Sequence, residues 1–397
     1  MTASSRIPVL FTHYGDEWFR GSEQLLIDLL SNLNRDRVEP IVWCNGLAMA
    51  EAARSVGITT YRTPFEFYFD YSSPRFDLSR YRACVREGIS LVKRHNIKVL
   101  HANSAAPNQW LVPVARANRL PLLAHLHIDY LRRSRYALLL HQADLVVGVS
   151  EQVVQALRLD GMAGDRVKVI YNGIDFNRLT ERPAADLRTV IGVPEGAVLV
   201  GAAGSLIARK GYDLLLRALG RLPGTPPAHL VIAGSGSEEA ALRGLTAELG
   251  LADRVHFLGY RREVGDIYAS CDIFAGPSRA EAFGLVFAEA GYFQRPVVAT
   301  HVGGIPEVVA DGETGLLVPV GDIDALAAAL GRLAASRELR QRLGEAGRQR
   351  AETMFSAPKM ASAFAADYVR LAGLRRAGLG WGSLPGRGGP YLHLLKR

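Results

Sequence analysis

The sequence predicts an α/β protein built from two Rossmann-like domains that face each other across a cleft. The chain has 397 residues, more than a single hydrophobic core usually supports. Short apolar runs alternate with helical patterns along nearly the whole chain, as in parallel α/β sheets. Between two such series lies a segment with two prolines and little periodicity, residues 178–196. We interpret this segment as a linker.

The two series each contain six predicted strands with helical patterns between them. In the first series the strands are IPVLFTHY (7–14), EPIVWCN (39–45), VLHANS (99–104), PLLAHLHI (121–128), LVVGVS (145–150) and VKVIYNG (167–173). In the second they are AVLVGAAGSL (197–206), HLVIAGSG (229–236), RVHFLGY (254–260), IFAGPS (273–278), RPVVAT (295–300) and GLLVPV (315–320).

The chain accordingly divides into three predicted parts. Residues 1–180 form the first Rossmann-like domain, and residues 181–375 form the second domain with a final crossover helix. The last helical pattern, residues 356–374, is expected to pack back on the first domain. Residues 376–397 are rich in Gly and Pro and are expected to form an irregular tail.

The charge of the chain favours acidic partners such as nucleotides or phospholipids, because 47 Lys and Arg oppose 39 Asp and Glu, a net charge of +8. Residues 74–98 are rich in Arg and Lys. This pattern is typical of a solvated helix face and also of a basic amphipathic helix on an anionic membrane surface. No nucleic-acid-binding motif accompanies the charge, so nucleic acid is not an expected partner.

The sequence shows no membrane span and no targeting segment. No run reaches the roughly 18 to 20 apolar residues that a span needs, and MTASSRIPVLFTHYG lacks the features of a signal peptide. We expect a cytoplasmic protein, with the basic segment leaving open a peripheral attachment to the inner face of the cell membrane. Cys44, Cys84 and Cys271 lie far apart in apolar surroundings, which predicts reduced core thiols.

A basic turn follows the first strand of the second series. GSLIARKGYDLLLRAL (204–219) opens a helix whose N-terminal amides favour an anion, and Arg209 and Lys210 add positive charge there. The arrangement suits a diphosphate, with two surface cations on a turn as the alternative. IAGSGSEEAAL (232–242) resembles a dinucleotide turn only weakly, because Glu238 and Glu239 occupy the helix start. We interpret Gly234 as part of a tight turn that lets the chain approach a ligand.

Two carboxylates, Glu281 and Glu289, flank the apolar run AFGLVFA. Ligands of open parallel sheets bind beyond the carboxyl ends of the strands, which places Glu281 toward the cleft. A helix predicted to begin near Phe283 carries Glu289 roughly 80° round from Glu281. A carboxylate in an apolar helix needs a partner. Ribose hydroxyls would provide one, and so would a structural salt bridge.

Other strand ends carry polar or flexible residues. HVGGIPEVV (301–309) forms a turn whose glycines expose backbone amides to a phosphate or a sugar hydroxyl. The loop before SEQLLIDLL and the histidines of LHANS and LAHLHID end strands of the first series and would line one side of the cleft. Asp322 and Asp324 are interpreted as a helix cap, so no metal site is expected.

Taken together, these stretches resemble the retaining glycosyltransferases of family 4, which have the GT-B fold of two Rossmann-like domains. EAFGLVFAEA (281–290) matches the Glu-x7-Glu motif of that family. Further matches, in the family's order over roughly residues 8–370, are GSEQ, HANS, LHID, ADLVVGVSE, VIYNGID, GSLIARKG, VIAGSG, VHFLGY, GGIPEVV and GLLVP. The resemblance implies that the first domain binds the acceptor and that the second binds a nucleotide-sugar.

The resemblance also implies roles for individual residues. Glu289 would hold the ribose hydroxyls, Glu281 would contact the donor sugar, and Lys210 would neutralise the diphosphate leaving group. His127 would lie near the reacting sugar, and Gly21 would belong to a loop facing the phosphates. The other positions implied on the donor side are Ser205, Gly234, Gly284, Gly303 and Gly304. No metal or other cofactor is implied, because cations and helix amides take the place of the metal.

Two positions depart from the family pattern. Ser205 stands where the family usually has an arginine, and the paired glycine of the first-domain loop is Arg20–Gly21 here. We hypothesise that Arg209 or Arg20 supplies the missing positive charge.

The leading interpretation is a retaining hexosyltransferase that moves a sugar from a nucleoside-diphosphate donor to a glycan or lipid-linked acceptor. We expect this enzyme to act in the assembly of envelope or exopolysaccharide glycans. A sugar-nucleotide epimerase or phosphorylase on the same fold, and a non-catalytic nucleotide-sugar-binding scaffold, remain open. A glycoside hydrolase would need the two glutamates to face each other across a substrate at about 5 to 9.5 Å.

Overall fold

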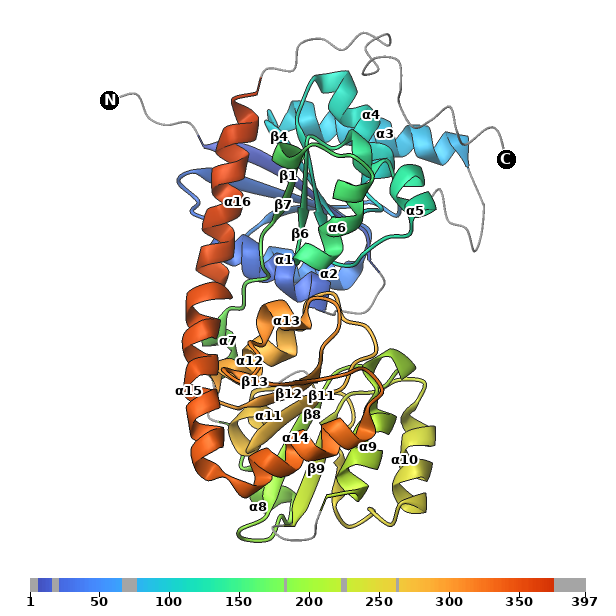
Figure 1. Cartoon of the computed structure of the whole chain (residues 1–397). Coiled ribbons are helices and arrows are strands. Elements are labelled where there is room, and N and C mark those ends of the chain that lie inside the picture. Colours follow the sequence, from blue (N-terminus) through green and yellow to red (C-terminus); the bar gives the residue numbers. More distant parts are fainter. Residues whose placement is uncertain are drawn as a thin grey trace.

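The computed structural model describes residues 6–15, 21–65, 77–181, 184–222, 227–261 and 264–374. Arg20 and the tail predicted at 376–397 therefore lie outside the described residues. Within the described ranges the chain forms two separate parallel sheets, each with helices on its faces (Figure 1). The predicted fold class, two Rossmann-like domains, is confirmed.

The first sheet has seven strands in the order β3-β2-β1-β4-β5-β6-β7. Their bounds are β1 (Ile7–His13), β2 (Val38–Cys44), β3 (Thr59–Arg62), β4 (Val99–Asn103), β5 (Leu122–Leu126), β6 (Leu145–Gly148) and β7 (Val167–Val169). β3 was not predicted from the sequence. This strand is four residues long, lies at the sheet edge beside β2 and is nowhere fully buried, so it lacks the apolar run that marks the other strands.

The second sheet has six strands in the order β10-β9-β8-β11-β12-β13. Their bounds are β8 (Val198–Ala203), β9 (Ala228–Ala233), β10 (Val255–Phe257), β11 (Ile273–Gly276), β12 (Val297–Thr300) and β13 (Gly315–Val318). All six coincide with predicted strands. In both sheets the strand order reverses direction beside the first strand, and open parallel sheets bind ligands at such a point, beyond the carboxyl ends.

Helices cover both sheets. The first series contains α1 (Gly21–Asn32), α2 (Leu47–Ser55), α3 (Leu78–Arg94), α4 (Asn108–Asn118), α5 (Arg132–Ala137), α6 (Glu151–Leu159) and α7 (Phe176–Thr180). The second contains α8 (Leu187–Ile191), α9 (Tyr212–Gly220), α10 (Glu239–Glu248), α11 (Gly265–Ser270), α12 (Leu285–Tyr292), α13 (Ile305–Val308), α14 (Ile323–Ala335) and α15 (Arg337–Met354). The last helix is α16 (Ala357–Ala372).

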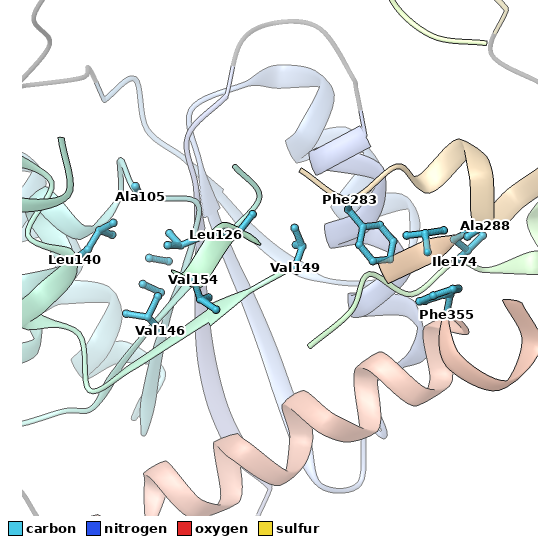
Figure 2. Packing of buried hydrophobic residues seen from close by; sticks show 14 of the residues in the cluster. Ala105, Leu126, Leu140, Val146, Val149, Val154, Ile174, Phe283, Ala288 and Phe355 are labelled. Atoms are coloured by element: carbon cyan, nitrogen blue, oxygen red, sulfur yellow. The ribbon is translucent and has the colours of Figure 1, made fainter. Parts of the chain in front are cut away.

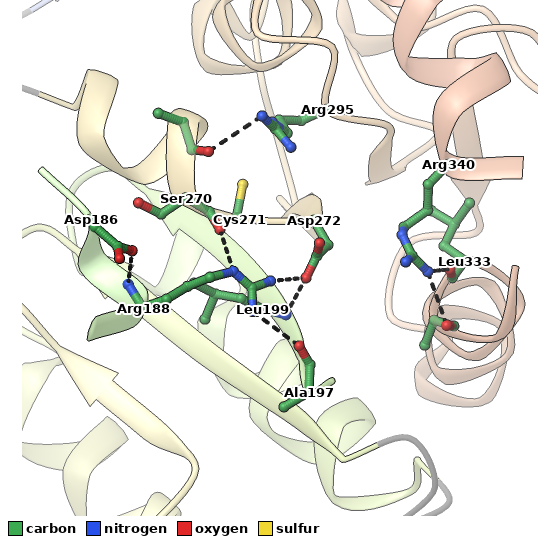
Figure 3. Close-up of polar contacts among 12 residues, drawn as sticks. Asp186, Arg188, Ala197, Leu199, Ser270, Cys271, Asp272, Arg295, Leu333 and Arg340 are labelled. Atoms are coloured by element: carbon green, nitrogen blue, oxygen red, sulfur yellow. Dashed lines mark hydrogen bonds and ion pairs between the residues drawn. The ribbon is translucent and has the colours of Figure 1, made fainter. Parts of the chain in front are cut away.

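The segment interpreted as a linker, residues 178–196, is more ordered than predicted. It contains α8, in which Leu187 is buried. Arg188 forms an ion pair with Asp272 and donates hydrogen bonds to the carbonyls of Ser270 and Ala197 (Figure 3). These contacts attach the second half of the segment to the second sheet.

The last helix returns to the first domain, as predicted. α15 and α16 run along one side of the molecule and pass from the second sheet to the first (Figure 1). α16 packs on α1, β1 and β4. Its Tyr368 hydroxyl lies 2.8 Å from His101 Nδ1 in β4, and Asp367 pairs with Lys168 at 2.8 Å.

One apolar cluster continues from the first domain into the second. Val149, immediately after β6, and Phe283, before α12, belong to the same cluster of buried residues. Figure 2 shows the line from Val146 through Val149 to Phe283, Ala288 and Phe355. The two sheets are therefore joined by packed side chains as well as by the chain crossings.

Two further expectations concern the basic segment and the cysteines. In α3, Cys84 and Leu91 face the core, while Arg82 and Arg86 are exposed. This arrangement fits a solvated face as well as a membrane-surface helix, so membrane attachment stays a prediction. Among the described residues, no helix is both long and apolar enough to cross a bilayer. All three cysteines are free and buried, as expected.

Candidate active site

The candidate site lies where loops at the carboxyl ends of the two sheets meet. Ser150, after β6, donates its hydroxyl to the carbonyl of Ala282, after β11, at 2.6 Å. Gly21, the first residue of α1, lies against Leu285, the first residue of α12; a methyl group at Gly21 would stand 3.8 Å from the Leu285 side chain. The residues predicted on both sides of the cleft are thus gathered around one junction.

The basic turn and Glu281 form one charged group. Lys210 forms an ion pair with Glu281, and both side chains are largely shielded from solvent. The Arg209 guanidinium donates to the carbonyl of Ala280 at 2.8 Å and lies 3.8 Å from Glu281 Oε1. The turn stays close to this loop because Gly211, at φ 70°, leaves room for the carbonyl of Pro277. Two cations and one carboxylate therefore converge beside the start of α9.

The glycines after β9 pack closely on the basic turn. A Cβ at Gly234 would stand 1.9 Å from the carbonyl oxygen of Gly204, and a Cβ at Gly236 would stand 2.3 Å from that of Leu206. Both glycines therefore permit close packing against the basic turn, and the approach of Gly234 to a ligand stays a prediction. Hydrogen bonds from Leu206 N to Ser235 O and from Glu238 N to Leu206 O hold the two loops together. Ser205, between them, is exposed.

The glycine turn after β12 packs directly on the Glu281 loop. A Cβ at Gly303, whose φ is 56°, would stand 1.9 Å from the Glu281 carbonyl oxygen, and Gly304 N donates to that oxygen at 3.0 Å. Gly284 adopts φ 96° immediately before α12, a conformation that favours glycine. Because α12 begins at Leu285, Glu281 precedes the helix, and the predicted 80° helical offset between Glu281 and Glu289 does not apply.

Glu289 lies in the interior of α12 and is 9% exposed. The Tyr268 hydroxyl donates to its carboxylate at 2.6 Å. Burial raises the pKa of Glu289, while the Tyr268 hydrogen bond and the charge of Arg178 oppose that shift. Arg178 also pairs with Asp28 of α1 at 3.5 Å. Tyr268 is therefore one partner of this carboxylate, which the motifs did not identify, and contact with ribose hydroxyls stays a prediction.

His127 lies on the first domain, just after β5. Its Nε2 is 2.9 Å from Asn103 Oδ1 at the end of β4. Burial, and after it the electrostatic effect of the neighbouring His13, lowers the pKa of His127 to about 4, so the imidazole is neutral at pH 7. Arg20, the other cation proposed on this side, lies outside the described residues.

Glu307, at the end of the glycine turn after β12, bridges the two domains. Its carboxylate accepts hydrogen bonds from the backbone amides of Glu151 and Gln152, at 2.9 and 3.3 Å, which begin α6 of the first domain. A carboxylate at a helix N-terminus is favourable because it faces unpaired amides and the positive end of the helix dipole. Asp322 caps α14 through the amide of Ala325, which confirms the helix-cap interpretation.

His125 provides a stability prediction for this region. Both its ring nitrogens are buried without a hydrogen-bond partner among the described residues. Burial lowers its pKa well below the ordinary 6.5. The unfolded chain therefore takes up a proton as the pH falls below 6.5, while the folded chain does not, and stability falls by about 1.4 kcal/mol per pH unit from this group.

We expect His125→Leu to reduce this acid sensitivity. Urea unfolding at pH 7 and pH 5 measures it: the loss of unfolding free energy on acidification should be smaller in the variant by about 2 kcal/mol. Equal losses in the two proteins would show that His125 does not remain neutral in the fold.

Comparison with known proteins agrees with this geometry. The family model described as Glycosyltransferase Family 4 matches residues 19–178, and the model described as Glycosyl transferases group 1 matches residues 184–350. The chain belongs to the family 4, or group 1, glycosyltransferases. In this group 1 glycosyltransferase the first match spans β2 to β7 of the first sheet, and the second match spans the whole second sheet.

Relatives include the D-inositol 3-phosphate glycosyltransferase of Saccharomonospora viridis, 37% identical over 220 residues. That match covers 52% of this chain and 51% of the relative, so it spans about half the length of each. The N-acetyl-alpha-D-glucosaminyl L-malate synthase of Bacillus anthracis is 26% identical over 312 residues, covering 76% of this chain and 81% of the relative.

Among solved structures, Anabaena Alr3699/HepE in complex with UDP and glucose superimposes with a TM-score of 0.78 at 25% identity. The match covers 92% of this chain and all of that chain. A glycosyltransferase from Rickettsia africae, 18% identical, has a TM-score of 0.79 and covers 92% of this chain and 98% of its own. The predicted GT-B fold is confirmed by these neighbours.

Proposed function

We propose that this protein is a retaining, metal-independent glycosyltransferase that moves a sugar from a nucleoside-diphosphate donor to an acceptor hydroxyl. The observation that carries the proposal is the Lys210–Glu281 ion pair, with Arg209 beside it, at the junction of the two domains. Cations at this point face the position where negative charge develops as a sugar–phosphate bond ionises.

In this mechanism the ammonium group of Lys210 leaves Glu281 and forms an ion pair with the donor diphosphate. The start of α9 and Arg209 contribute further positive charge, which serves where other enzymes use a metal ion. Glu281, released from its ion pair, then accepts hydrogen bonds from hydroxyls of the donor sugar. Glu289 accepts hydrogen bonds from the ribose hydroxyls, which would relieve the cost of burying its carboxylate.

The donor proposed is a UDP-sugar. Anabaena Alr3699/HepE, whose fold this chain shares, was solved with UDP and glucose. The acceptor proposed is a hydroxyl on an acidic molecule or an envelope glycan. The relatives are named for inositol 3-phosphate and for L-malate, and both are anionic, which suits a chain with a net charge of +8.

The test has two stages. Purified protein is first screened with UDP-, GDP- and ADP-sugars for an increase in melting temperature, and UDP-sugars should stabilise it most. The stabilising donor is then incubated with and without inositol 3-phosphate, L-malate or a lipid-linked glycan, and nucleoside diphosphate release is measured. Release should require an acceptor. Conversion of the donor without any acceptor would indicate an epimerase, and binding without release would indicate a scaffold.

Arg209 is proposed to supply the positive charge that an arginine usually provides in this family at the position of Ser205. We expect Arg209→Ala to lower turnover by about 10- to 100-fold with little change in melting temperature, because the side chain is half exposed and, among the described residues, donates its hydrogen bond to a backbone carbonyl. Arg221→Ala is the control, since Arg221 is an exposed arginine of the same domain paired with Asp324. If turnover of Arg209→Ala were within twofold of wild type, the positive charge would have to come from Arg20 or another cation.

A further inference from the structure

Four polar side chains form a continuous chain of contacts that ends at His127. Glu23 Oε1 lies 3.0 Å from His13 Nε2, Asn103 Nδ2 lies 2.9 Å from His13 Nδ1, and Asn103 Oδ1 lies 2.9 Å from His127 Nε2. The four residues come from α1, β1, β4 and the loop after β5. They are separated by up to 114 positions, so only the parallel order of the sheet brings them together.

The three residues behind His127 are buried. Glu23 is 5% exposed, His13 is 3% exposed and Asn103 is 1% exposed, whereas His127 is only partly buried. Polar groups in the interior are costly unless they are paired. A buried network with every member bonded in this way rigidifies the groups at its ends.

The backbone next to the network leaves space for the side chains of His13 and Glu23. A Cβ at Gly15 would stand 2.6 Å from His13 Nε2 and 2.7 Å from Glu23 Oε1, so only glycine fits over this pair. Both backbone groups of Gly15 are held by the Asn45 side chain, at 3.0 and 2.8 Å. Ser104, next to Asn103, adopts φ 106°, a strained conformation for a residue with a side chain.

The chemistry of these groups fixes the direction of each hydrogen bond. An ionised carboxylate only accepts, and the contact with His13 helps to lower the pKa of Glu23 to about 2, so Glu23 is ionised at neutral pH. His13 therefore donates from Nε2, and its Nδ1 accepts from the Asn103 Nδ2 amide group, which can only donate. Asn103 Oδ1 then accepts from His127, which must carry its proton on Nε2.

This direction leaves His127 Nδ1 as an acceptor. Within the described residues no hydrogen bond is made by Nδ1, and it is not among the buried unpartnered atoms. Its pKa of about 4 keeps the ring neutral at pH 7. The titratable groups around it are His13 and Glu23 through Asn103, and His125, whose ring centre is 4.4 Å away.

We propose that Glu23, His13 and Asn103 are positioning residues that hold His127 in the Nε2–H tautomer, with Nδ1 presented to accept a hydrogen bond from a hydroxyl of the donor sugar. The inference rests on the proposed glycosyltransferase function for its kinetic consequence, but the tautomer itself does not depend on activity. In this role His127 orients the sugar and does not act as a proton donor.

The kinetic test is a double-mutant cycle between Asn103 and His127. Asn103→Leu should lower kcat by about 10- to 100-fold in the wild-type background, with the affinity for UDP unchanged because UDP lacks the donor sugar. In the His127→Ala background the same substitution should have no further effect on kcat. Equal losses in both backgrounds would overturn the proposal.

Two variants separate positioning from folding. Asn103→Asp retains an oxygen acceptor for His127 and should keep most of the kcat that Asn103→Leu loses. Asn118→Leu removes another partly buried amide, which bonds only to the carbonyl of Val114 among the described residues, and should leave kcat unchanged. If Asn103→Asp is as slow as Asn103→Leu while both fold, the acceptor role of Asn103 is wrong.

A second measurement decides the tautomer even if no donor is turned over. The 15N chemical shifts of the His127 ring at pH 7 should show a protonated Nε2 and an unprotonated Nδ1, in wild type and in Asn103→Asp. In Asn103→Leu the two shifts should move toward the averaged values of a free ring. A proton on Nδ1 in the wild-type protein would refute the proposed network, while failure of donor turnover alone would refute only the glycosyltransferase function.

Discussion

Lys210→Ala is expected to lower kcat by about 10²- to 10³-fold, because it removes the cation placed where the leaving diphosphate gains charge. The substitution also leaves Glu281, whose side chain is only 12% exposed, without its ammonium partner. An unpaired carboxylate at this position repels the diphosphate and adds to the loss. Steady-state release of nucleoside diphosphate measures the effect.

The control for Lys210→Ala is Lys168→Ala. Lys168 is also an ion-paired lysine, bonded to Asp367 at 2.8 Å between β7 and α16, on the first domain. Its loss should affect stability modestly and leave kcat unchanged. A kcat for Lys210→Ala within fivefold of wild type, in a folded protein, would contradict the role assigned to the basic turn.

Glu289→Gln is expected to weaken UDP binding by about 10- to 100-fold, since hydrogen bonds to a charged acceptor contribute about 1.5–3 kcal/mol. Gln has the same shape and can still accept from the Tyr268 hydroxyl, so the fold should be retained. Glu281→Gln should instead slow transfer of the donor sugar, because Glu281 is proposed to contact that sugar, which is absent from UDP. Calorimetric titration with UDP and steady-state kinetics with the full donor separate the two effects.

Glu345→Gln is the matched control for this pair of glutamates. Glu345 lies in α15 and lines a cavity of about 500 Å³ with Arg188 and Asp272, away from the basic turn. The Glu345→Gln variant should bind UDP with the affinity of the wild-type protein and turn over the donor at the wild-type rate. If Glu289→Gln and Glu281→Gln changed UDP affinity and kcat to the same extent, the division of labour between ribose and sugar would be wrong.

Much of the fold could be predicted because most of the parallel strands are largely apolar runs of three to seven residues, which the sequence displays directly. β3 was missed for the opposite reason, since an edge strand half exposed to solvent carries no such run. α8 was missed because its anchoring contacts, above all that of Arg188 with Asp272, join residues 84 positions apart.

The site was predictable only in part. Lys210 and Glu281 were each found from local motifs, but their pairing across 71 positions depends on the adjacency of β8 and β11. The glycines at 234 and 303 were recognised as special, yet local sequence could not show that they pack on other loops. Asn103 and Glu23 lie within the motifs HANS and GSEQ, but only the order of the strands shows that they form one network with His127.

The most direct test of the account is acceptor-dependent release of UDP from a UDP-sugar, measured side by side for wild type and Glu281→Ala. The account predicts release by the wild-type protein that requires an acceptor and is nearly abolished in the variant, with the fold of both confirmed by thermal unfolding. Release that is unchanged in Glu281→Ala would contradict the assignment of the active site to the loops around Lys210 and Glu281.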